Sequence, residues 1–442
     1  MVIEAIRTAS LGDTSYVLAH SGFGIVIDPQ RDIRRFLEAI ERLDVSVTHV
    51  IDTHIHNDYL SGAPALARRL DSELVMPAGS GAGFAFVPAF HLEEMKGGGP
   101  ITIRPLHTPG HTPEHMSYLV LIDGMPSAVF TGGSLLVGSA GRSDLLGAEF
   151  AESLARLQYL SVNRLAELPG DVEVLPTHGA GSFCTSSAEA GGGASTIAAE
   201  VRSNPVLQYA DADSFATGEL EGLLPYPDYY ASMAPINRRN PGSLETVVVP
   251  LVAAPKIDPD ARVVDMRPRD RYFAGHLPGS LNIEWGSSFA PWVGWLVPFG
   301  TPVHLVLEPL QDPVWAATEL GRIGYHVIGA TNDLSGVDLV ESRTAGVDEV
   351  AAAIEAGELV LDVRDPSEWK SSHAEGTIHR YVPDLRHDIP GSGGDAVWVV
   401  CASGFRAAIA ASLVERAGRT PVAVTTGGIS GLLKAHPELR AT

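Results

Sequence analysis

Cysteine is scarce in this chain, which has only two among its 442 residues, Cys184 and Cys401. Two thiols cannot build the disulfide framework that stabilises small secreted domains. The chain is therefore expected to fold around a hydrophobic core in a reducing compartment, and a cytoplasmic location is the simple expectation. Because thiols are so few, the sequence around each of them is informative about function.

Basic residues are also under-represented, with 31 lysines and arginines against 53 acidic residues and a net charge of −22. Nucleic acids and anionic membranes are bound by basic surfaces, so neither is an expected partner. No run of about 18 apolar residues indicates a membrane span, and residues 1–20 lack the features of a signal peptide. The 45% of hydrophobic and 19% of charged residues describe a folded globular chain.

Histidines gather in three segments of the first half of the chain. The first is Thr53-His54-Ile55-His56-Asn57-Asp58-Tyr59, which follows an apolar run at 47–52 that is predicted to be a strand. The others are 106–115, with His111 on a Pro-Gly turn, and 176–181, with His178. Imidazoles and a carboxylate on such loops can converge on one cation. Three further histidines are interpreted as hydrogen-bonded structural residues: His49, His107 and His115.

These segments resemble the His-x-His-x-Asp-His signature of the metallo-β-lactamase fold. Together with the segments 130–133 and 141–144, they resemble its glyoxalase II and persulfide dioxygenase branch over roughly residues 1–230. The resemblance implies an α/β fold, the αββα sandwich. Persulfide dioxygenases hold one iron by two histidines, corresponding to His54 and His111, and by an aspartate at the position of Gly133. Glyoxalase II hydrolases hold two metals and also use the position of Tyr59.

The departures at Gly133 and Tyr59 predict a mononuclear site. Two lost ligands should abolish a dinuclear hydrolase site, whereas His56 could replace the missing aspartate and give a face of His54, His56 and His111. Open positions on such a site suit Fe(II), one per chain, and the same ligands suit zinc. Asp58 and His178 are expected to support the ligands through hydrogen bonds. A lactamase-like domain without metal is the alternative.

The second half of the chain repeats itself loosely beyond a linker near residues 237–242. The segment 262–267 parallels 359–364, and 276–281 parallels 373–378, a period of about 97 residues. This period suits two small α/β domains in tandem. We therefore expect three domains, at 1–236, 245–340 and 345–442.

The second thiol opens the loop Cys401-Ala402-Ser403-Gly404-Phe405-Arg406, between an apolar strand and a predicted helix. Backbone N–H groups at the start of a helix favour a thiolate, and Arg406 would attract an anionic sulfur donor. The loop resembles the rhodanese active loop, Cys-x-x-Gly-x-Arg, in which the cysteine forms a persulfide and passes the outer sulfur to an acceptor. The earlier repeat also resembles rhodanese but has no cysteine at 305–312, which implies a spacer or docking domain.

The domain order resembles that of multidomain persulfide dioxygenase–sulfurtransferases. The resemblance implies sulfide detoxification: oxidation of a low-molecular-weight thiol persulfide by O2 to sulfite at iron, and movement of sulfur between persulfide, thiosulfate and sulfite through Cys401. Cys184 is interpreted either as a participant in sulfur handling or as a plain buried thiol. The open alternatives are a sulfurtransferase with a degenerate metal domain, a thioester hydrolase of the glyoxalase II type, and a sulfur carrier. Assembly as a homo-oligomer is also left open.

Overall fold

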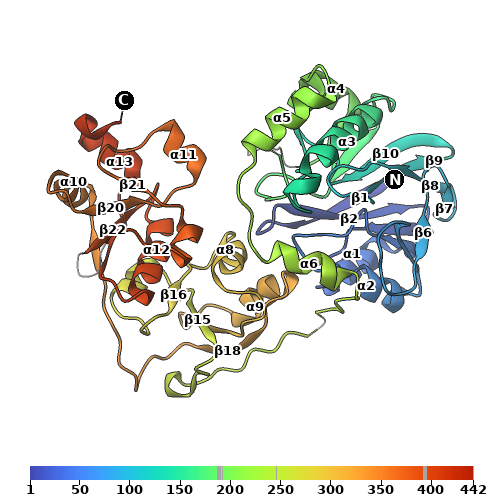
Figure 1. The fold of residues 1–442 in the computed structure, drawn as a ribbon. Helices are drawn as coiled ribbons and strands as arrows, with labels where there is room; N and C mark the ends of the chain where they lie inside the picture. Colours follow the sequence, from blue (N-terminus) through green and yellow to red (C-terminus); the bar gives the residue numbers. More distant parts are fainter. Residues whose placement is uncertain (187–190, 192, 245, 392–395, 442) are drawn as a thin grey trace. The chain divides into compact units, whose positions relative to one another are not determined.

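The chain divides into two compact units (Figure 1). The computed structural model describes residues 1–186, 191, 193–244, 246–391 and 396–441. The first unit consists of Met1–Val247 with Gly321–Gly324, and the second consists of Val248–Leu320 with Tyr325–Thr442. The expected domain limits at residues 245 and 442 fall outside the described residues.

Two mixed six-stranded sheets form the centre of the first unit. The strands of the first sheet are, in spatial order, β1 (Val2–Thr8), β2 (Asp13–His20), β3 (Phe23–Ile27), β4 (Ser46–Ile51), β5 (Glu73–Pro77) and β6 (Val87–Ala89). Those of the second sheet are β14 (Ser195–Thr196), β13 (Glu173–Pro176), β10 (Met125–Gly132), β9 (Met116–Ile122), β8 (Ile101–His107) and β7 (Met95–Lys96). A short hairpin of β11 (Leu135–Leu136) and β12 (Ser139–Ala140) follows β10.

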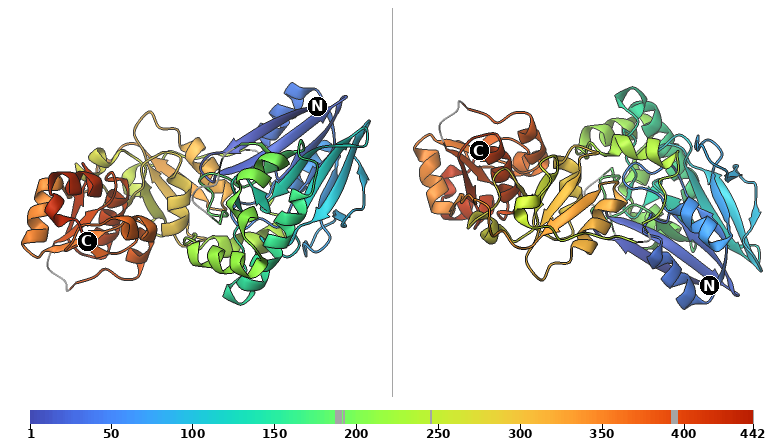
Figure 2. Two further views of the ribbon diagram at one scale, coloured as in Figure 1. Left: turned by 90° about the horizontal axis from the view of Figure 1, so that it is seen from above. Right: turned by 90° about the horizontal axis from the view of Figure 1, so that it is seen from below.

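Helices cover the outer faces of both sheets (Figures 1 and 2). They are α1 (Arg34–Leu43), α2 (Ala63–Leu70), α3 (Ala148–Ala166), α4 (Ile197–Ser203), α5 (Ala212–Gly222) and α6 (Tyr230–Asn237), with a 3-10 turn η1 (Pro205–Gln208). Successive side chains along each strand point to opposite faces of the sheet. Leu18 and Tyr118 lie in the core between the sheets, whereas Val17 packs with α1 and α2, and Leu119 packs with α3. The expected αββα sandwich is therefore confirmed.

The spacing of apolar residues in the sequence predicts helices at 31–43, 63–70 and 149–168, and the structure has a helix at each of these places. The helix expected at 63–70 is α2, and those expected at 31–43 and 149–168 are α1 and α3, each shifted at its ends. Pro64 fits the first turn of α2 because its missing N–H would have no partner there. Asp71 ends the same helix in the left-handed conformation. Between α2 and β4 lies the histidine loop, residues 52–62, which is buried throughout.

The second unit contains two parallel sheets with matching strand orders. The first sheet runs β16 (Leu281–Asn282), β15 (Arg262–Asp265), β17 (Val303–Val306) and β18 (Val327–Thr331). The second runs β21 (Ile378–His379), β20 (Leu359–Asp362), β22 (Val397–Val400), β23 (Pro421–Val424) and β19 (Arg343–Ala345). The helices and 3-10 turns are η2 (Ala254–Lys256), α7 (Arg269–Phe273), α8 (Phe289–Leu296), α9 (Pro313–Arg322), α10 (Val347–Glu355), α11 (Pro366–Ser371), η3 (Val382–Arg386), α12 (Phe405–Arg416), α13 (Gly428–Ala435) and η4 (Pro437–Leu439).

The repeated sequence motif makes the same ion pair in both halves of this unit. Arg267 pairs with Asp265 at the end of β15, and Arg364 pairs with Asp362 at the end of β20, with an Nη2–Oδ2 distance of 2.6 Å in both cases. Both carboxylates are buried, so each needs its cation. The loose sequence repeat therefore corresponds to a structural repeat with the same strand order.

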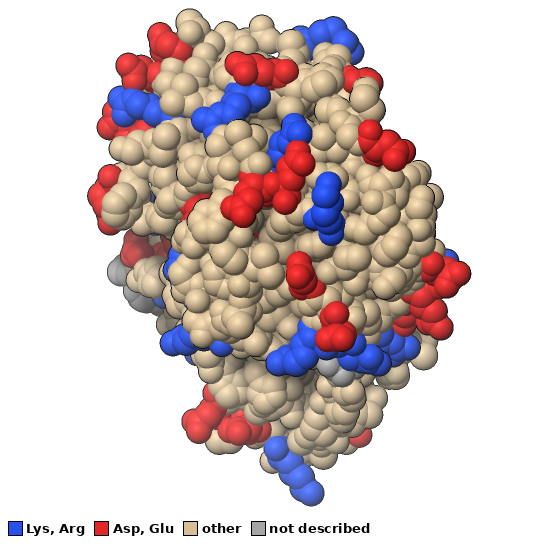
Figure 3. Space-filling model, turned by 90° about the vertical axis from the view of Figure 1, so that its right-hand side faces the viewer, with Lys and Arg blue, Asp and Glu red and all other residues tan. Residues whose placement is uncertain are grey.

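Two features of the structure relate to the expected partners: the length of the helices and the distribution of surface charge. None of the described helices is long and apolar enough to cross a bilayer. On the face drawn in Figure 3, acidic and basic side chains are intermixed over a surface of other residues. The expectations about nucleic acid and oligomeric state remain predictions.

Candidate functional site

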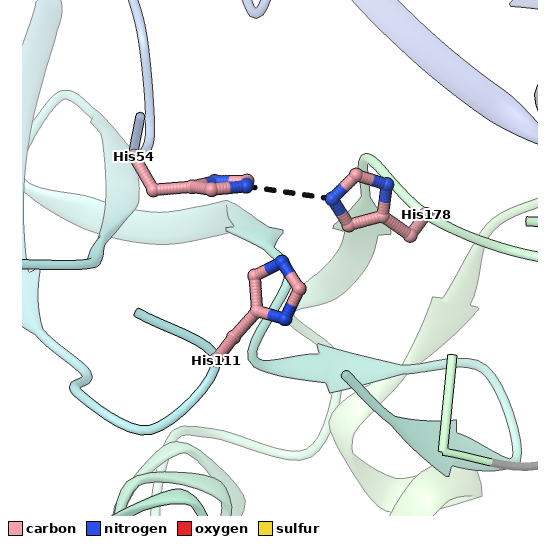
Figure 4. A group of neighbouring side chains, drawn as sticks. All are labelled: His54, His111 and His178. Atoms are coloured by element: carbon pink, nitrogen blue, oxygen red, sulfur yellow. Dashed lines mark hydrogen bonds between the residues drawn. The ribbon is translucent and has the colours of Figure 1, made fainter. Parts of the chain in front are cut away.

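Three histidines from three loops face one another in the first unit (Figure 4). His54 follows β4, His111 lies between β8 and β9, and His178 follows β13. The Nε2 atoms of His54 and His178 are 3.5 Å apart. The ring centroid of His111 lies 4.9 Å from that of His54 and 5.2 Å from that of His178. One nitrogen from each ring lies within 4.8 Å of the others, a spacing that could hold a metal ion.

The orientation of His54 is fixed by a chain of hydrogen bonds. Thr53 Oγ1 donates to Oδ2 of Asp28 (2.8 Å), so it accepts from Nδ1–H of His54 (2.8 Å). Burial lowers the pKa of His54 well below its ordinary value, and the neighbouring histidines lower it further. The neutral imidazole therefore carries its proton on Nδ1 and keeps a lone pair on Nε2, which is the form that binds a metal.

The other two imidazoles are oriented in the same way. Nδ1–H of His111 donates to the carbonyl oxygen of Arg142 (2.8 Å), and Nε2 of His111 is buried and has no hydrogen-bond partner among the described residues. Nδ1–H of His178 donates to Oδ1 of Asp13 (2.9 Å). Burial lowers the pKa of both histidines. All three rings thus present a nitrogen lone pair to one another's neighbourhood, and the Nε2 atom of His111 suits the role of a metal ligand.

His56, which is expected to bind the metal with His54 and His111, contacts a further group of side chains. Nε2 of His56 lies 3.0 Å from the Tyr59 hydroxyl and 3.3 Å from Oδ1 of Asp28. Its ring stacks on that of Tyr59, with centroids 4.2 Å apart. Burial lowers the pKa of His56, but the carboxylates around it, Asp28 first, raise the pKa to about 9. The third imidazole that faces His54 and His111 is that of His178 (Figure 4).

Asp58 lies beside this site, and its expected supporting role stays a prediction. One of its oxygens is 3.4 Å from Nδ1 of His178. Burial raises the pKa of Asp58 and that of Asp13 to about 7 each, and the charge of Asp13 raises the pKa of Asp58 further. His56, Asp58 and His178 form a second group of potential ligands. This group shares His178 with the first.

The position of the missing aspartate is filled by another residue. A Cβ atom on Gly133 would overlap the imidazole ring of His111. The backbone N–H of Gly133 donates to Nε2 of His115 (2.9 Å), whose Nδ1–H therefore points to Thr108 Oγ1 (2.9 Å). Burial lowers the pKa of His115 to about 3. His115 thus has both nitrogens engaged, in agreement with its interpretation as a structural residue.

Gln158 on α3 holds the loops around His111, and the sequence did not reveal it. Its Nε2 atom lies 3.0 Å from the carbonyl oxygens of Gly133, Ser134 and Gly141. Its Oε1 atom accepts from the backbone N–H of His111 (3.0 Å). The only signal in the sequence is a polar residue on the apolar side of a predicted helix.

Two buried carboxylates that position the histidines were also missed. Asp28 follows β3 with a φ of 50° and accepts hydrogen bonds from Thr53 and Thr177. Asp13 begins β2 and accepts from His178. Each adjoins an apolar strand, where an acidic residue is uncommon. That position was a usable signal, but it does not identify the partner.

The second candidate site is the loop between β22 and α12. Cys401 is 1% exposed, and its Sγ atom accepts from the backbone N–H of Gly404 (3.1 Å). The loop therefore has the expected arrangement of strand, thiol and helix N-terminus. Gly404 has a φ of 94°, a conformation that favours glycine.

Arg406 is engaged by acidic side chains of the same domain. Its guanidinium makes two hydrogen bonds to Glu368, one of them 2.9 Å long, and lies 3.6 Å from Asp365. Its positive charge is thus compensated in this structure. The expected part of Arg406 in binding an anionic donor stays a prediction.

Cys184 is buried in the first unit and resembles an inert thiol more than a reactive one. Its Sγ atom lies 3.9 Å from the Tyr230 hydroxyl. Burial raises the pKa of Cys184 well above its ordinary value, and Asp58 and Asp13 raise it further. A thiol in these surroundings stays protonated at neutral pH, which disfavours nucleophilic chemistry.

Two protein families match parts of the chain. Residues 11–178 match the metallo-beta-lactamase superfamily, and residues 346–435 match the rhodanese-like domain. Neither of these matches includes the middle domain. Its likeness to rhodanese rests on the repeated sequence and on the matching strand order.

Individual proteins give the same picture for the first unit. A hydroxyacylglutathione hydrolase of Acidiphilium cryptum (strain JF-5) is 30% identical over 48% of this chain and 92% of its own length. The mitochondrial persulfide dioxygenase ETHE1 of Homo sapiens is 30% identical over 37% of this chain and 62% of its own length. The chain spans about half the length of several other curated relatives.

A solved structure extends the similarity beyond the first unit. The crystal structure of a metallo-beta-lactamase from Staphylococcus aureus subsp. aureus COL has a TM-score of 0.67 and 25% sequence identity. It covers 75% of this chain and 98% of its own. The chain therefore belongs to the metallo-beta-lactamase superfamily and carries a rhodanese-like domain in its second unit.

Proposed function

We propose that this chain is an enzyme of sulfur metabolism with two sites. The first would oxidise a low-molecular-weight thiol persulfide with O2 to sulfite at one Fe(II), and the second would transfer sulfane sulfur through Cys401. The rhodanese-like domain and the similarity to a persulfide dioxygenase both support a role in sulfur metabolism. Because that relative is matched over only part of its length, the reaction itself is a proposal.

The convergence of three neutral imidazoles is the observation that carries the first site. His54, His111 and His178 would hold the ion through their Nε2 atoms. Iron with open coordination positions supplies activation of dioxygen, and zinc would accept the same ligands. The hydrogen bonds of Thr53 and Asp13 keep two of these rings aimed inward, and they fix the proton on Nδ1.

A cavity that is lined by one of the three histidines, His178, is a candidate place for a small substrate. It has a volume of about 190 Å³, and its lining includes Arg7, Asp13 and His178. Arg7 supplies a positive charge to this cavity. A thiol persulfide that carries carboxylates, such as glutathione persulfide, has the complementary charge.

Sulfur transfer at the second site follows from the position of Cys401. The thiolate would attack the sulfane sulfur of thiosulfate, which breaks the S–S bond and releases sulfite. An acceptor thiolate or sulfite would then take the outer sulfur and leave the Cys401 thiolate. The N–H of Gly404 would stabilise the negative charge on Sγ of the Cys401 thiolate, both before the attack and after the acceptor has left.

Thioester hydrolysis is a second candidate, favoured by the similarity to a hydroxyacylglutathione hydrolase. The residues at two positions argue against it. The Tyr59 hydroxyl is engaged by His56 and by the carbonyl oxygen of Asp28, and Gly133 has no side chain to bridge two metals. Because neither Tyr59 nor Gly133 supplies the metal ligand of the hydrolases, a sulfurtransferase with a degenerate metal domain is the closest alternative.

Oxygen uptake tests the proposed function. The protein is purified and loaded with Fe(II) without oxygen, and glutathione persulfide is then added in an oxygen electrode with sulfite as the measured product. We expect uptake that depends on persulfide and is lost in His178→Ala but kept in His107→Ala. The absence of oxygen uptake by iron-loaded protein would contradict the proposed dioxygenase activity. Thiosulfate:cyanide transfer by the same protein would then favour the sulfurtransferase alternative.

A further inference from the structure

Arg269 belongs to the domain without a cysteine, yet its side chain reaches the Cys401 loop of the other domain in the same unit. It lies at the start of α7, and its Nη1 atom donates to the carbonyl oxygen of Ser403 (3.0 Å). Its guanidinium carbon is 5.9 Å from the centre of the Phe405 ring. The loop that carries the nucleophile is therefore held from two domains.

The contact with Ser403 acts on the peptide group whose other end faces the sulfur. This peptide is trans, so its C=O and its N–H point in opposite directions. The oxygen of Ser403 faces Arg269, and the N–H of Gly404 faces Sγ of Cys401 (3.1 Å). A cationic donor on the carbonyl oxygen also polarises the peptide, which strengthens its N–H as a donor to an anion.

The backbone at Gly404 fits this arrangement closely. A Cβ atom on Gly404 would come within 2.8 Å of Nη1 of Arg269 and would overlap the carbonyl oxygen of Thr425. The φ of 94° is likewise unfavourable for other residues. The loop therefore packs against Arg269 in a conformation that only glycine adopts readily.

Arg269 is itself held in a fixed orientation. Its Nε and Nη2 atoms pair with the two oxygens of Glu284, at 2.7 and 2.8 Å, which leaves Nη1 for Ser403. The hydrogen bond to Glu284 raises the pKa of Arg269, and the charge of Cys401 adds to that effect. Arg406, by contrast, is taken up by Glu368 and Asp365.

We propose that Arg269 is a positioning residue for Cys401, which it serves through the Ser403–Gly404 peptide. By fixing this peptide, Arg269 aims the N–H of Gly404 at the sulfur and stabilises the thiolate and the persulfide that replaces it. The cysteine-free domain thus takes part in the chemistry and is more than a spacer. The inference rests on the proposed sulfur transfer at Cys401.

A pH titration of the Cys401 thiolate tests this inference in the full-length protein. Thiolate absorbance in the ultraviolet is followed against pH, and the matching Cys401→Ser protein is subtracted for each variant. Arg269→Ala should raise the midpoint by about one pH unit, which leaves about tenfold less thiolate below the midpoint. Arg271→Ala is the matched control, because it removes a cation from the same helix, 4.0 Å from Glu308.

The comparison separates this inference from the proposed function. A midpoint in Arg269→Ala equal to that in Arg271→Ala would overturn the inference, even if turnover fell. Should Arg269→Ala fail to fold, Arg269→Lys keeps one donor without the fork to Glu284 and should shift the midpoint in the same direction by less; no shift would again overturn it. Absence of thiosulfate:cyanide transfer in the unmodified protein would contradict only the proposed function, since the titration needs no turnover.

Discussion

The imidazole ring of His111 occupies the space into which a side chain on Gly133 would project. The two positions are therefore coupled: a chain with a carboxylate at 133 needs the ring of residue 111 elsewhere. In this chain the ring points its unpartnered Nε2 atom toward His54 and His178. The inward-facing ring of His111 therefore requires a residue without a side chain at position 133.

Gly133→Asp should lower metal content and stability, although it restores the ligand type of the related enzymes. The new Cβ must displace His111 from its hydrogen bond to the Arg142 carbonyl. Metal analysis and thermal unfolding of the variant measure both effects. Gly222→Asp is the control, since a Cβ there meets no other atom within 4 Å. Higher metal content in Gly133→Asp than in unmodified protein would contradict the coupling.

Tyr59→Phe should destabilise the first unit by about 1–3 kcal/mol without loss of metal, because it removes two buried hydrogen bonds of about 0.5–1.5 kcal/mol each. The hydroxyl lies 3.0 Å from Nε2 of His56 and 3.2 Å from the carbonyl oxygen of Asp28. Urea unfolding and metal analysis check the two parts. Tyr159→Phe, which loses a more exposed hydrogen bond to Tyr209, should cost less. Metal loss in Tyr59→Phe would mean that the group around His56 belongs to the metal site.

Glu219→Gln should weaken the loss of stability that accompanies rising pH. Glu219 is buried and lies 2.9 Å from the Ser143 hydroxyl, and burial raises its pKa from 4.5 to about 8. Between these values the folded protein keeps a proton that the unfolded chain has lost. Stability from this group is thus complete below pH 4.5 and declines by up to about 1.4 kcal/mol per pH unit until about pH 8.

Thermal midpoints of the first unit at about pH 5 and about pH 8 measure this effect. The unmodified protein should lose more stability across the interval than Glu219→Gln, whereas the exposed control Glu221→Gln should behave like the unmodified protein. Equal losses in all three proteins would show that Glu219 is ionised in the folded state.

Cys401→Ser should abolish thiosulfate:cyanide transfer, and Cys184→Ser should leave it nearly unchanged. Both thiols are buried, but only Cys401 accepts a backbone N–H at the start of a helix. Burial raises the pKa of Cys184, which keeps that thiol protonated. A spectrophotometric thiocyanate assay on both variants checks the assignment. Transfer that survives in Cys401→Ser and disappears in Cys184→Ser would reverse the two roles.

Much of the fold follows from local patterns in the sequence. Adjacent side chains of a strand point to opposite faces, so the apolar pair Val17 and Leu18 predicts a strand that is buried on both faces. The start of α2 is marked by Gly62, Ala63 and Pro64, and its end by Asp71. The repeat of Asp265 and Asp362 predicts two related domains, because each aspartate ends a strand and pairs with the arginine two residues further on. These features depend on residues close together in the chain.

The identity of the third inward-facing histidine depends on contacts that sequence spacing does not show. His56 is two residues from His54, which made it the natural candidate, but Asp28 and Tyr59 turn its ring away and keep it protonated. His178 lies 124 residues from His54 and meets it only in the folded protein. The pairing of Arg406 with Glu368, across 38 residues, was invisible for the same reason.

Metal content tests the central claim most directly. The protein is purified without oxygen from iron-supplemented cells, and iron and zinc are quantified per chain in the unmodified protein, His178→Ala, His56→Gln and His107→Ala. We predict one metal ion per chain in the unmodified protein, loss of that ion in His178→Ala, and retention in the other two folded variants. Metal retained in His178→Ala but lost in folded His56→Gln would contradict the assignment of His54, His111 and His178.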